Sequence, residues 1–326
     1  MSKNVFSKVL LFALPASGKS EIRNFMAKVD PQVLKDEFHI GETIQLDDFP
    51  YVFMMRRIDE ELMKLGHKPL FYASNDSTLL DERDWGTLIN LLNEDYYDLM
   101  NRVVVKPDSY ARHLFTRIDN AALKAGIPYR IAPLSEEVKE KVAAALEERA
   151  RFLQEDKHGE YPETMEGKTI IVEAARGGAQ GAAMPLSDPM GYQYSLRQFC
   201  PEMLEDAVIL YIYVTPEESR RKNEARSDPN DPGSILHHGV PIQVMLDEYG
   251  CDDMMYLRSI SEKENTITVE AHGKKYYLPI GVFDNREDKT TFLRGEMDTW
   301  KEDKVVDVID AIRKATDLMY DLYTEN

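Results

Sequence analysis

VFSKVLLFALPASGKSEIRNF, residues 5–25, joins an apolar run, a turn of small residues and the start of a helix. Residues 5–14 are β-prone and apolar almost throughout, which is typical of a central parallel strand covered on both faces. A helix is expected to follow at once from Ser20. This order of strand, tight turn and helix predicts an α/β protein built around a mostly parallel sheet.

The turn Ala13–Ser20 has the residue types of a phosphate-binding loop. Consecutive N–H groups at a helix N-terminus bind phosphate oxygens, Lys19 reaches the terminal phosphates, and the Ser20 hydroxyl can ligate Mg²⁺. Gly18 allows close approach of the backbone. Ala13 stands where the usual pattern has its first glycine, and alanine is the smallest substitute for it. The residues expected to bind the nucleotide are Ala16, Ser17, Gly18, Lys19, Ser20 and Glu21.

Further strands are expected along the chain. A β-prone run at 43–46 ends in two aspartates, and two apolar runs lie at 167–178 and 207–214. Residues 274–285 suggest either a fifth strand or one half of a hairpin with 266–273. The pattern predicts a doubly wound, mostly parallel sheet interrupted by a large helical insertion.

The insertion is expected to span residues 52–157, because the second and third strands are much farther apart than the roughly 10 to 12 residues of a simple crossover. Apolar residues recur there three and four positions apart, which predicts helices. The helical stretches are 51–66, 84–103, 109–126 and 134–154. The predicted organisation is a core with a lid at 1–51 and 158–326, and a substrate-capping helical region at 52–157.

Composition narrows the class of partner. A formal charge of −18 and a pI near 4.9 disfavour nucleic acid and anionic membranes, but allow a small anion held by a few basic groups. Cys200 and Cys251 are the only cysteines, which excludes a disulfide framework and indicates a reducing compartment. With no membrane-spanning run and no leader pattern, we expect a cytoplasmic protein. The sequence does not indicate an oligomeric state.

Several motifs in order along the chain resemble those of the P-loop kinases, the phosphotransferases of nucleosides, nucleotides and small metabolites. They are the loop, LDDFPY at 46–51, IIVEAARGG at 170–178 and YVTPEESRRKNEAR at 213–226. The resemblance covers the sheet and the lid but not the helical insertion. It implies ATP- and Mg²⁺-dependent transfer of a γ-phosphoryl group to a nucleoside, nucleotide or sugar-like acceptor.

The resemblance also assigns roles to strand-end acids. QLDDFPY is similar to the turn of uridine kinase and ribosyl-nucleoside kinases in which the first acid takes the acceptor proton, and by position that acid is Asp47. Asp48 is the alternative base, or a group near the metal. Both aspartates could instead cap the following helix. Glu173, at the end of the third strand, corresponds to the acid that holds Mg²⁺ directly or through water.

Basic residues complete the predicted site. Arg176 is expected to face an anionic substrate or the transferred phosphoryl group, unless it forms a surface ion pair. Arg56 can reach an acidic or phosphorylated acceptor. Arg221 and Arg226 correspond to the arginines of a lid that closes on the nucleotide phosphates, the alternative being a solvated basic face.

The segment 227–241 is expected to be the mobile part of that lid. His237 and His238 within it lack the spacing of paired metal ligands on one helix face. Two other functions stay open from the sequence: a P-loop NTPase that drives a protein partner, and a kinase of polynucleotide or protein ends.

Overall fold

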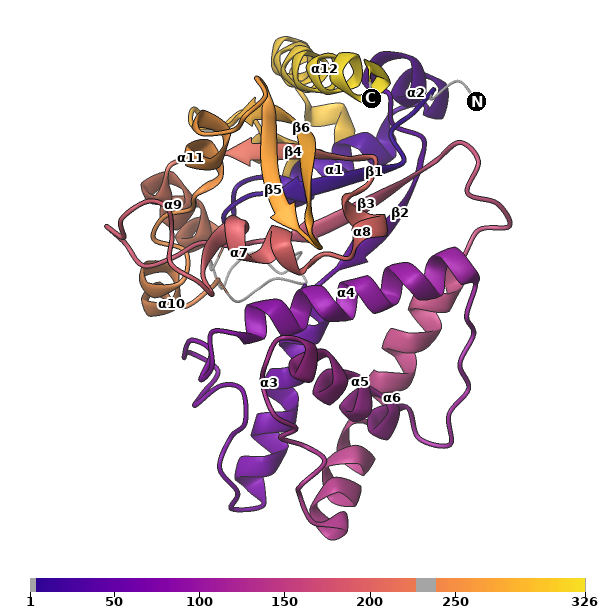
Figure 1. Cartoon of the computed structure of the whole chain (residues 1–326). Helices are drawn as coiled ribbons and strands as arrows, with labels where there is room; N and C mark the ends of the chain where they lie inside the picture. The colour runs from indigo at the N-terminus through magenta and orange to yellow at the C-terminus, as the bar shows by residue number, and fades with distance from the viewer. Residues whose placement is uncertain (1–3, 227–238, 326) are drawn as a thin grey trace.

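A six-stranded mixed sheet lies at the centre of the fold (Figure 1). This computed structural model describes residues 4–226 and 239–325. The strand order is β2-β3-β1-β4-β6-β5, and all neighbours are parallel except β5 and β6. The strands are β1 Lys8–Phe12, β2 Glu42–Asp47, β3 Lys168–Ala174, β4 Ala207–Tyr213, β5 Thr266–Ala271 and β6 Lys274–Asp284. The expectation of an α/β fold with a mostly parallel sheet is confirmed.

Strand β1 is the central strand that its apolar sequence predicts. It pairs with β3 on one side and β4 on the other, and all five of its residues are buried. Leu10 and Phe12 belong to a hydrophobic cluster on one face of the sheet, whereas Val9 and Leu11 belong to a cluster on the opposite face. Successive side chains of a strand point to opposite faces, so a strand covered on both is largely apolar. The polar exception in β1 is Lys8, whose ammonium donates to the Glu202 carbonyl at 2.8 Å.

Strand β6 reconciles the two readings of residues 266–285. It pairs in parallel with β4, so it is the fifth parallel strand, and it also pairs antiparallel with β5. The hairpin and the parallel strand are therefore both present. Its carboxyl end brings Asp284 and Asn285 to the same edge of the sheet as the turn after β1.

Helices cover both faces of the sheet. Ile22, Phe38 and Ile312, from α1, α2 and α12, share the cluster on one face, and Tyr192 and Met254, from α7 and α11, share the cluster on the other. These helices and their neighbours are α1 Lys19–Lys28, α2 Pro31–Phe38, α7 Gly191–Gln198, α8 Pro201–Leu204, α9 Pro216–Arg226, α10 Ile242–Asp247, α11 Met254–Ser259 and α12 Glu302–Glu325, with 3₁₀ turns η1 Thr291–Arg294 and η2 Met297–Thr299.

The predicted helical insertion lies between β2 and β3. Its helices are α3 Phe49–Lys64, α4 Asp84–Asn101, α5 Tyr110–Lys124 and α6 Glu136–Gly159. Figure 1 shows α4 between the sheet and the rest of the insertion. Leu88 and Leu91 of α4 enter the insertion's own hydrophobic cluster, whereas Ile89 and Leu92 enter the cluster on the sheet. Because α4 is buried on two sides, it fixes the insertion to the sheet.

A repeated motif shapes the insertion. RIDEELMKLG at 57–66 and RIDNAALKAG at 117–126 carry the same Arg-Ile-Asp, Lys and Gly at the same spacing. Each motif ends its helix at a glycine with positive φ, 78° at Gly66 and 80° at Gly126. Each aspartate then accepts three backbone N–H bonds from the loop that follows, Asp59 from residues 70–72 and Asp119 from residues 130–132.

The two arginines of this motif differ in burial. Arg117 is 5% exposed at its side chain and donates to Asp95, at 2.6 Å, and to the Tyr51 hydroxyl, at 3.0 Å. Lys157 completes this buried network through a 2.7 Å ion pair with Asp95. The network joins α3, α4, α5 and α6. Arg57 is 36% exposed, and its ion pair among the described residues is with Glu60 on its own helix.

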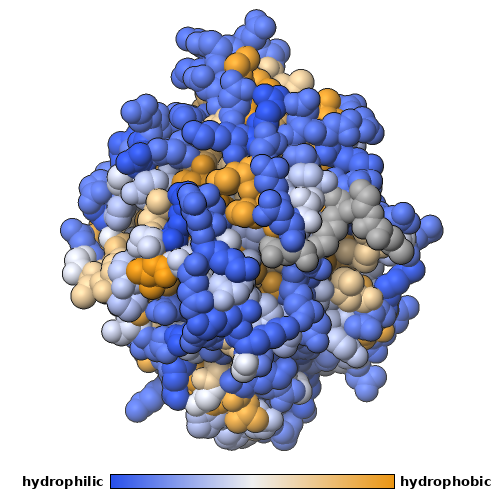
Figure 2. All heavy atoms as spheres, turned by 45° about the horizontal axis from the view of Figure 1, so that its top comes forward, coloured by the Kyte–Doolittle hydropathy of each residue, from blue (hydrophilic) through white to orange (hydrophobic). Residues whose placement is uncertain are grey.

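The visible surface is mostly polar. Figure 2 shows a largely hydrophilic face, on which hydrophobic residues form small, separate patches. Within the described part of the chain, no helix combines the length and apolar character that crossing a membrane requires.

Candidate functional site

The turn between β1 and α1 presents a run of backbone N–H groups that have no described partner. Ala16 and Gly18 adopt left-handed φ values of 55° and 106°, which curl the backbone around the start of the helix. The N–H groups of residues 16–20 donate no hydrogen bond to any residue that the structure describes. The Ser17 hydroxyl is also buried without a described partner. Consecutive N–H groups in such a turn bind anions, and buried donors normally have partners, so the turn fits phosphate oxygens.

Gly18 is required by the protein around it as well as by its own conformation. A Cβ atom there would lie 2.5 Å from Thr290 Oγ1 and 2.7 Å from Asn285 Nδ2. Real Cβ atoms do not come this close to other heavy atoms. The segment after β6 therefore packs directly behind the loop, a contact that adds to the sequence-based reason for this glycine.

Lys19 and Ser20 begin α1 and are half-buried. Lys19 forms no ion pair with any described residue, although its charge lowers the pKa of Asp47. The predicted roles of Lys19 toward phosphate and of Ser20 toward Mg²⁺ stay predictions. Glu21 is already engaged by the protein. Its buried carboxylate accepts a 2.7 Å hydrogen bond from Arg294, which links α1 to the turn η1.

The strand-end acids meet beside the loop. Asp47 of β2 is the register partner of Glu173 of β3, and Glu173 is the partner of Leu11 of β1. Glu173 Oε1 accepts a 2.8 Å hydrogen bond from Arg23 of α1 and a second bond from Gln45. The structure thus brings Asp47 and Glu173 together at the edge where β1 enters the loop, as the shared carboxyl ends of parallel strands require.

Asp47 lies in an environment that raises the pKa of its carboxyl group. Burial, together with the neighbouring carboxylates of Asp48 and Glu173, raises the pKa of Asp47 to about 7, against the lowering effects of the Phe49 N–H and of Lys19. The Phe49 N–H, at the start of α3, donates to Asp47 Oδ1 at 2.9 Å and so fixes the orientation of the carboxylate. A carboxylate with a pKa near neutrality can take a proton from a hydroxyl and release it again.

Asp48 differs from Asp47 because its carboxylate is held in a buried ion pair. Its carboxylate forms a 2.6 Å ion pair with Arg176, whose side chain is only 1% exposed. Arg176 also donates to Ser195 of α7 at 3.0 Å, and its guanidinium lies 4.8 Å from the ring centroid of Trp85 in α4. The pair therefore joins the sheet to the insertion. Arg176 forms a buried ion pair rather than a surface one, and its Nη2 has no described partner.

Arg56 contacts none of the strand-end acids and does not contact Arg176. Its guanidinium donates to the carbonyls of Ser74, Asn75 and Ser77 at 3.1, 2.8 and 3.3 Å, and it stacks 3.8 Å from the Tyr72 ring centroid. These contacts hold the loop between α3 and α4.

Helix α9 begins with the Thr215 hydroxyl accepting from the Glu218 N–H at 3.2 Å. Arg221 is exposed and pairs with Glu218 at 2.6 Å and with Asp288 at 3.4 Å. The side chain of Arg226 lies outside the described residues. The same holds for most of the predicted lid segment, including His237 and His238, so those expectations stay predictions.

The sequence-based prediction gave no role to five residues of this region: Ser219, Lys222, Asn285, Asp288 and Thr290. Ser219 of α9 donates to the Pro15 carbonyl at 2.7 Å, and Lys222 forms a 2.8 Å ion pair with Asp288. Asn285 donates to the Ser17 carbonyl at 2.6 Å, and Thr290 lies behind Gly18. A signal existed for Asn285, because it directly follows a strand whose carboxyl end shares an edge with the loop.

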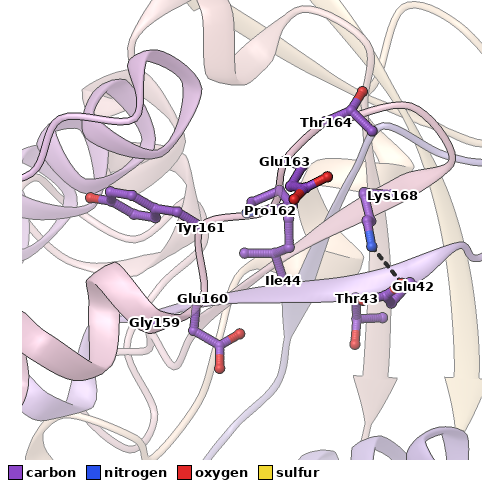
Figure 3. Close-up of a pocket in the computed structure, with 10 residues that line it drawn as sticks. All are labelled: Glu42, Thr43, Ile44, Gly159, Glu160, Tyr161, Pro162, Glu163, Thr164 and Lys168. Carbon is purple, nitrogen blue, oxygen red and sulfur yellow. Dashed lines mark ion pairs between the residues drawn. The ribbon is translucent and has the colours of Figure 1, made fainter.

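A pocket of about 440 Å³ opens at the opposite end of β2 and β3 (Figure 3). Its lining includes Glu42 and Lys168, which pair with each other across the first residues of the two strands. Ile44 is the lining residue nearest to Asp47 along β2, and three residue steps, about 10 Å, separate the two. None of the loop or strand-end residues lines it.

Comparison with protein-family models, curated proteins and solved structures finds no match for this chain. The site is therefore interpreted from its own geometry. Among the described residues, no group of three or more His, Cys, Asp or Glu side chains forms a ready metal cage. Mg²⁺ beside nucleotide phosphates needs only one or two protein ligands, which Ser20 and Glu173 can provide.

Proposed function

We propose that this chain is an ATP- and Mg²⁺-dependent phosphotransferase of the P-loop kinase type, acting on a hydroxyl of a small metabolite. The observation that carries the proposal is the run of unpartnered N–H groups at 16–20 beside Asp47, a carboxyl group with a pKa of about 7. The parallel strand order β2-β3-β1-β4-β6, with the loop after the central strand, supports a doubly wound nucleotide-binding fold.

Each residue has a role in this proposal. The N–H groups of residues 16–20 and the Lys19 ammonium would bind phosphate oxygens, and Ser20 and Glu173 would hold Mg²⁺. Bound ATP would supply the γ-phosphoryl group to the acceptor oxygen and leave as ADP, and Mg²⁺ would neutralise charge on the phosphate oxygens. Asp47 would accept the hydroxyl proton, and its raised pKa suits that task at neutral pH.

The acceptor side supports a substrate of low charge. Asp48 already neutralises the buried Arg176, which also contacts the Trp85 ring, the Ser195 hydroxyl and the Ala175 carbonyl. A second phosphate placed there would meet the carboxylates of Asp47 and Asp48. Nucleosides and sugar-like metabolites are therefore the first acceptors to screen, with the matching nucleotides as the comparison.

Mass spectrometry of an acceptor panel incubated with Mg²⁺ and ATP tests the proposal. We expect a product heavier by one phosphoryl group with the wild type, and none with Lys19→Ala. Lys28→Ala is the matched control, because Lys28 ends the same helix with its ammonium 4.8 Å from the Trp300 ring centroid. Asp47→Asn should lower turnover far more than affinity for ATP.

Two results would contradict this function. One is steady ATP hydrolysis that no acceptor changes, which would favour an NTPase that drives a partner. The other is near-normal phosphoryl transfer by Lys19→Ala, which would remove the loop from the reaction.

A further inference from the structure

Two side chains from distant parts of the chain hold the phosphate loop from behind. Asn285 follows β6 and is fully buried, and its Nδ2 donates to the Ser17 carbonyl at 2.6 Å. Ser219 of α9 is also fully buried, and its hydroxyl donates to the Pro15 carbonyl at 2.7 Å. Both acceptors are backbone carbonyls of the loop.

Fixing a carbonyl fixes the N–H of the same peptide. A trans peptide is planar, and its C=O and N–H point in opposite directions. The Ser17 carbonyl shares a peptide with the Gly18 N–H, and the Pro15 carbonyl shares one with the Ala16 N–H. Because each carbonyl is drawn toward a side chain behind the loop, each N–H is turned toward the opposite side, where neither has a described partner.

The orientation of the Asn285 amide is itself determined. Its Oδ1 accepts the Lys289 N–H at 2.7 Å, so the nitrogen end must face the Ser17 carbonyl. The backbone N–H of Asn285 donates to the Tyr213 carbonyl at the end of β4. A 2.8 Å ion pair between Lys222 and Asp288 joins α9 to the segment after β6. Ser219 and Asn285 therefore lie on two elements, α9 and the segment after β6, that are joined to each other.

We propose that Asn285 and Ser219 are positioning residues for the nucleotide, which turn the N–H groups of Gly18 and Ala16 toward the phosphates. This inference rests on the proposed function. It assigns part of the affinity for phosphate to residues that do not touch the ligand. Without either side chain the corresponding peptide can rotate, and its N–H no longer faces the phosphate oxygens.

The substitutions that test this are Asn285→Asp and Ser219→Ala. Asn285→Asp keeps the oxygen that accepts from Lys289 but replaces the donor with a second oxygen against the Ser17 carbonyl. Ser219→Ala removes one hydroxyl without a change of charge. The matched control is Asn93→Asp, because Asn93 likewise donates to one backbone carbonyl, of Gln198, and accepts from one N–H, of Cys200, in another part of the fold.

Titration calorimetry with Mg²⁺ and ATP gives the readout, and thermal unfolding gives the structural comparison. Since hydrogen bonds to charged groups are strong, we expect both loop variants to bind ATP about ten- to hundredfold more weakly than the wild type. Asn93→Asp should lose stability as Asn285→Asp does, yet bind ATP like the wild type.

The outcomes separate the two proposals. If the wild type binds no ATP with Mg²⁺, the proposed function fails, and this inference with it. If the wild type binds and both loop variants bind equally well, the function stands and the positioning role is overturned. Should Asn285→Asp fail to fold, Ser219→Ala carries the same test, since it only removes a hydroxyl.

Discussion

Neighbouring carboxylates at the end of β2 should respond to the same substitution with opposite changes in stability. The folded protein raises the pKa of Asp47 from 3.8 to about 7, so an ionised Asp47 is unfavourable in the fold. Asp48, by contrast, is paired with the buried Arg176. We therefore expect Asp47→Asn to stabilise the protein at pH 8 and Asp48→Asn to destabilise it.

The size of the first effect follows from linkage. A shift of about three pKa units corresponds to about 4 kcal/mol, because each unit is worth about 1.4 kcal/mol. Asp47 keeps partial contact with solvent, and asparagine recovers only part of the cost, so we expect a gain of about 1–3 kcal/mol. The cost is absent below about pH 4, grows as the pH rises toward 7, and is constant above that. The advantage of Asp47→Asn should therefore widen between pH 5 and pH 8.

Asp48→Asn should lose about 3 kcal/mol, because it leaves the Arg176 guanidinium buried without its carboxylate. Urea unfolding of the wild type and both variants at pH 5 and pH 8 measures these differences. A loss of stability in Asp47→Asn at pH 8, or shifts of the same sign in both variants, would refute the assignment of separate roles to the two acids.

Three further predictions follow from the same structure. Gly18→Ala should lose about 2 kcal/mol and most ATP affinity, measured by unfolding and calorimetry, because its Cβ would meet Thr290 at a φ of 106°. Arg117→Met should cost about 3 kcal/mol in urea unfolding, whereas Arg57→Met, which replaces an arginine that is 36% exposed, should cost less than about 1 kcal/mol. Equal losses in the two variants would show that burial of the arginine does not set the cost. With an acceptor in hand, kcat/KM should rise as the pH passes about 7, where Asp47 loses its proton; a flat profile would exclude it as the base.

Local signals were enough to predict most elements of the core. Each of these signals is contained in a short stretch of sequence: the apolar run of β1, the proline and acids that start α9, and the apolar spacing of α3–α6. The meeting of Asp47 and Glu173 also followed, because parallel strands share their carboxyl ends.

The contacts that the sequence could not predict join residues far apart in the chain. Asn285 lies 268 positions from Ser17, and no local pattern links the two. The pairing of Arg176 with Asp48, against Trp85, depends on how α4 packs on the sheet. Short helices such as α7 and α10 lack the length over which apolar spacing becomes informative.

The central claim is that the amides after β1 bind phosphate, and amide NMR of protein labelled with ¹⁵N-glycine tests it most directly. On addition of Mg²⁺ and ADP, the account predicts a downfield shift of the Gly18 amide proton as it gains a charged acceptor, while Gly126 and Gly273, in turns outside the site, stay unchanged. An unchanged Gly18 resonance at saturating nucleotide would contradict it.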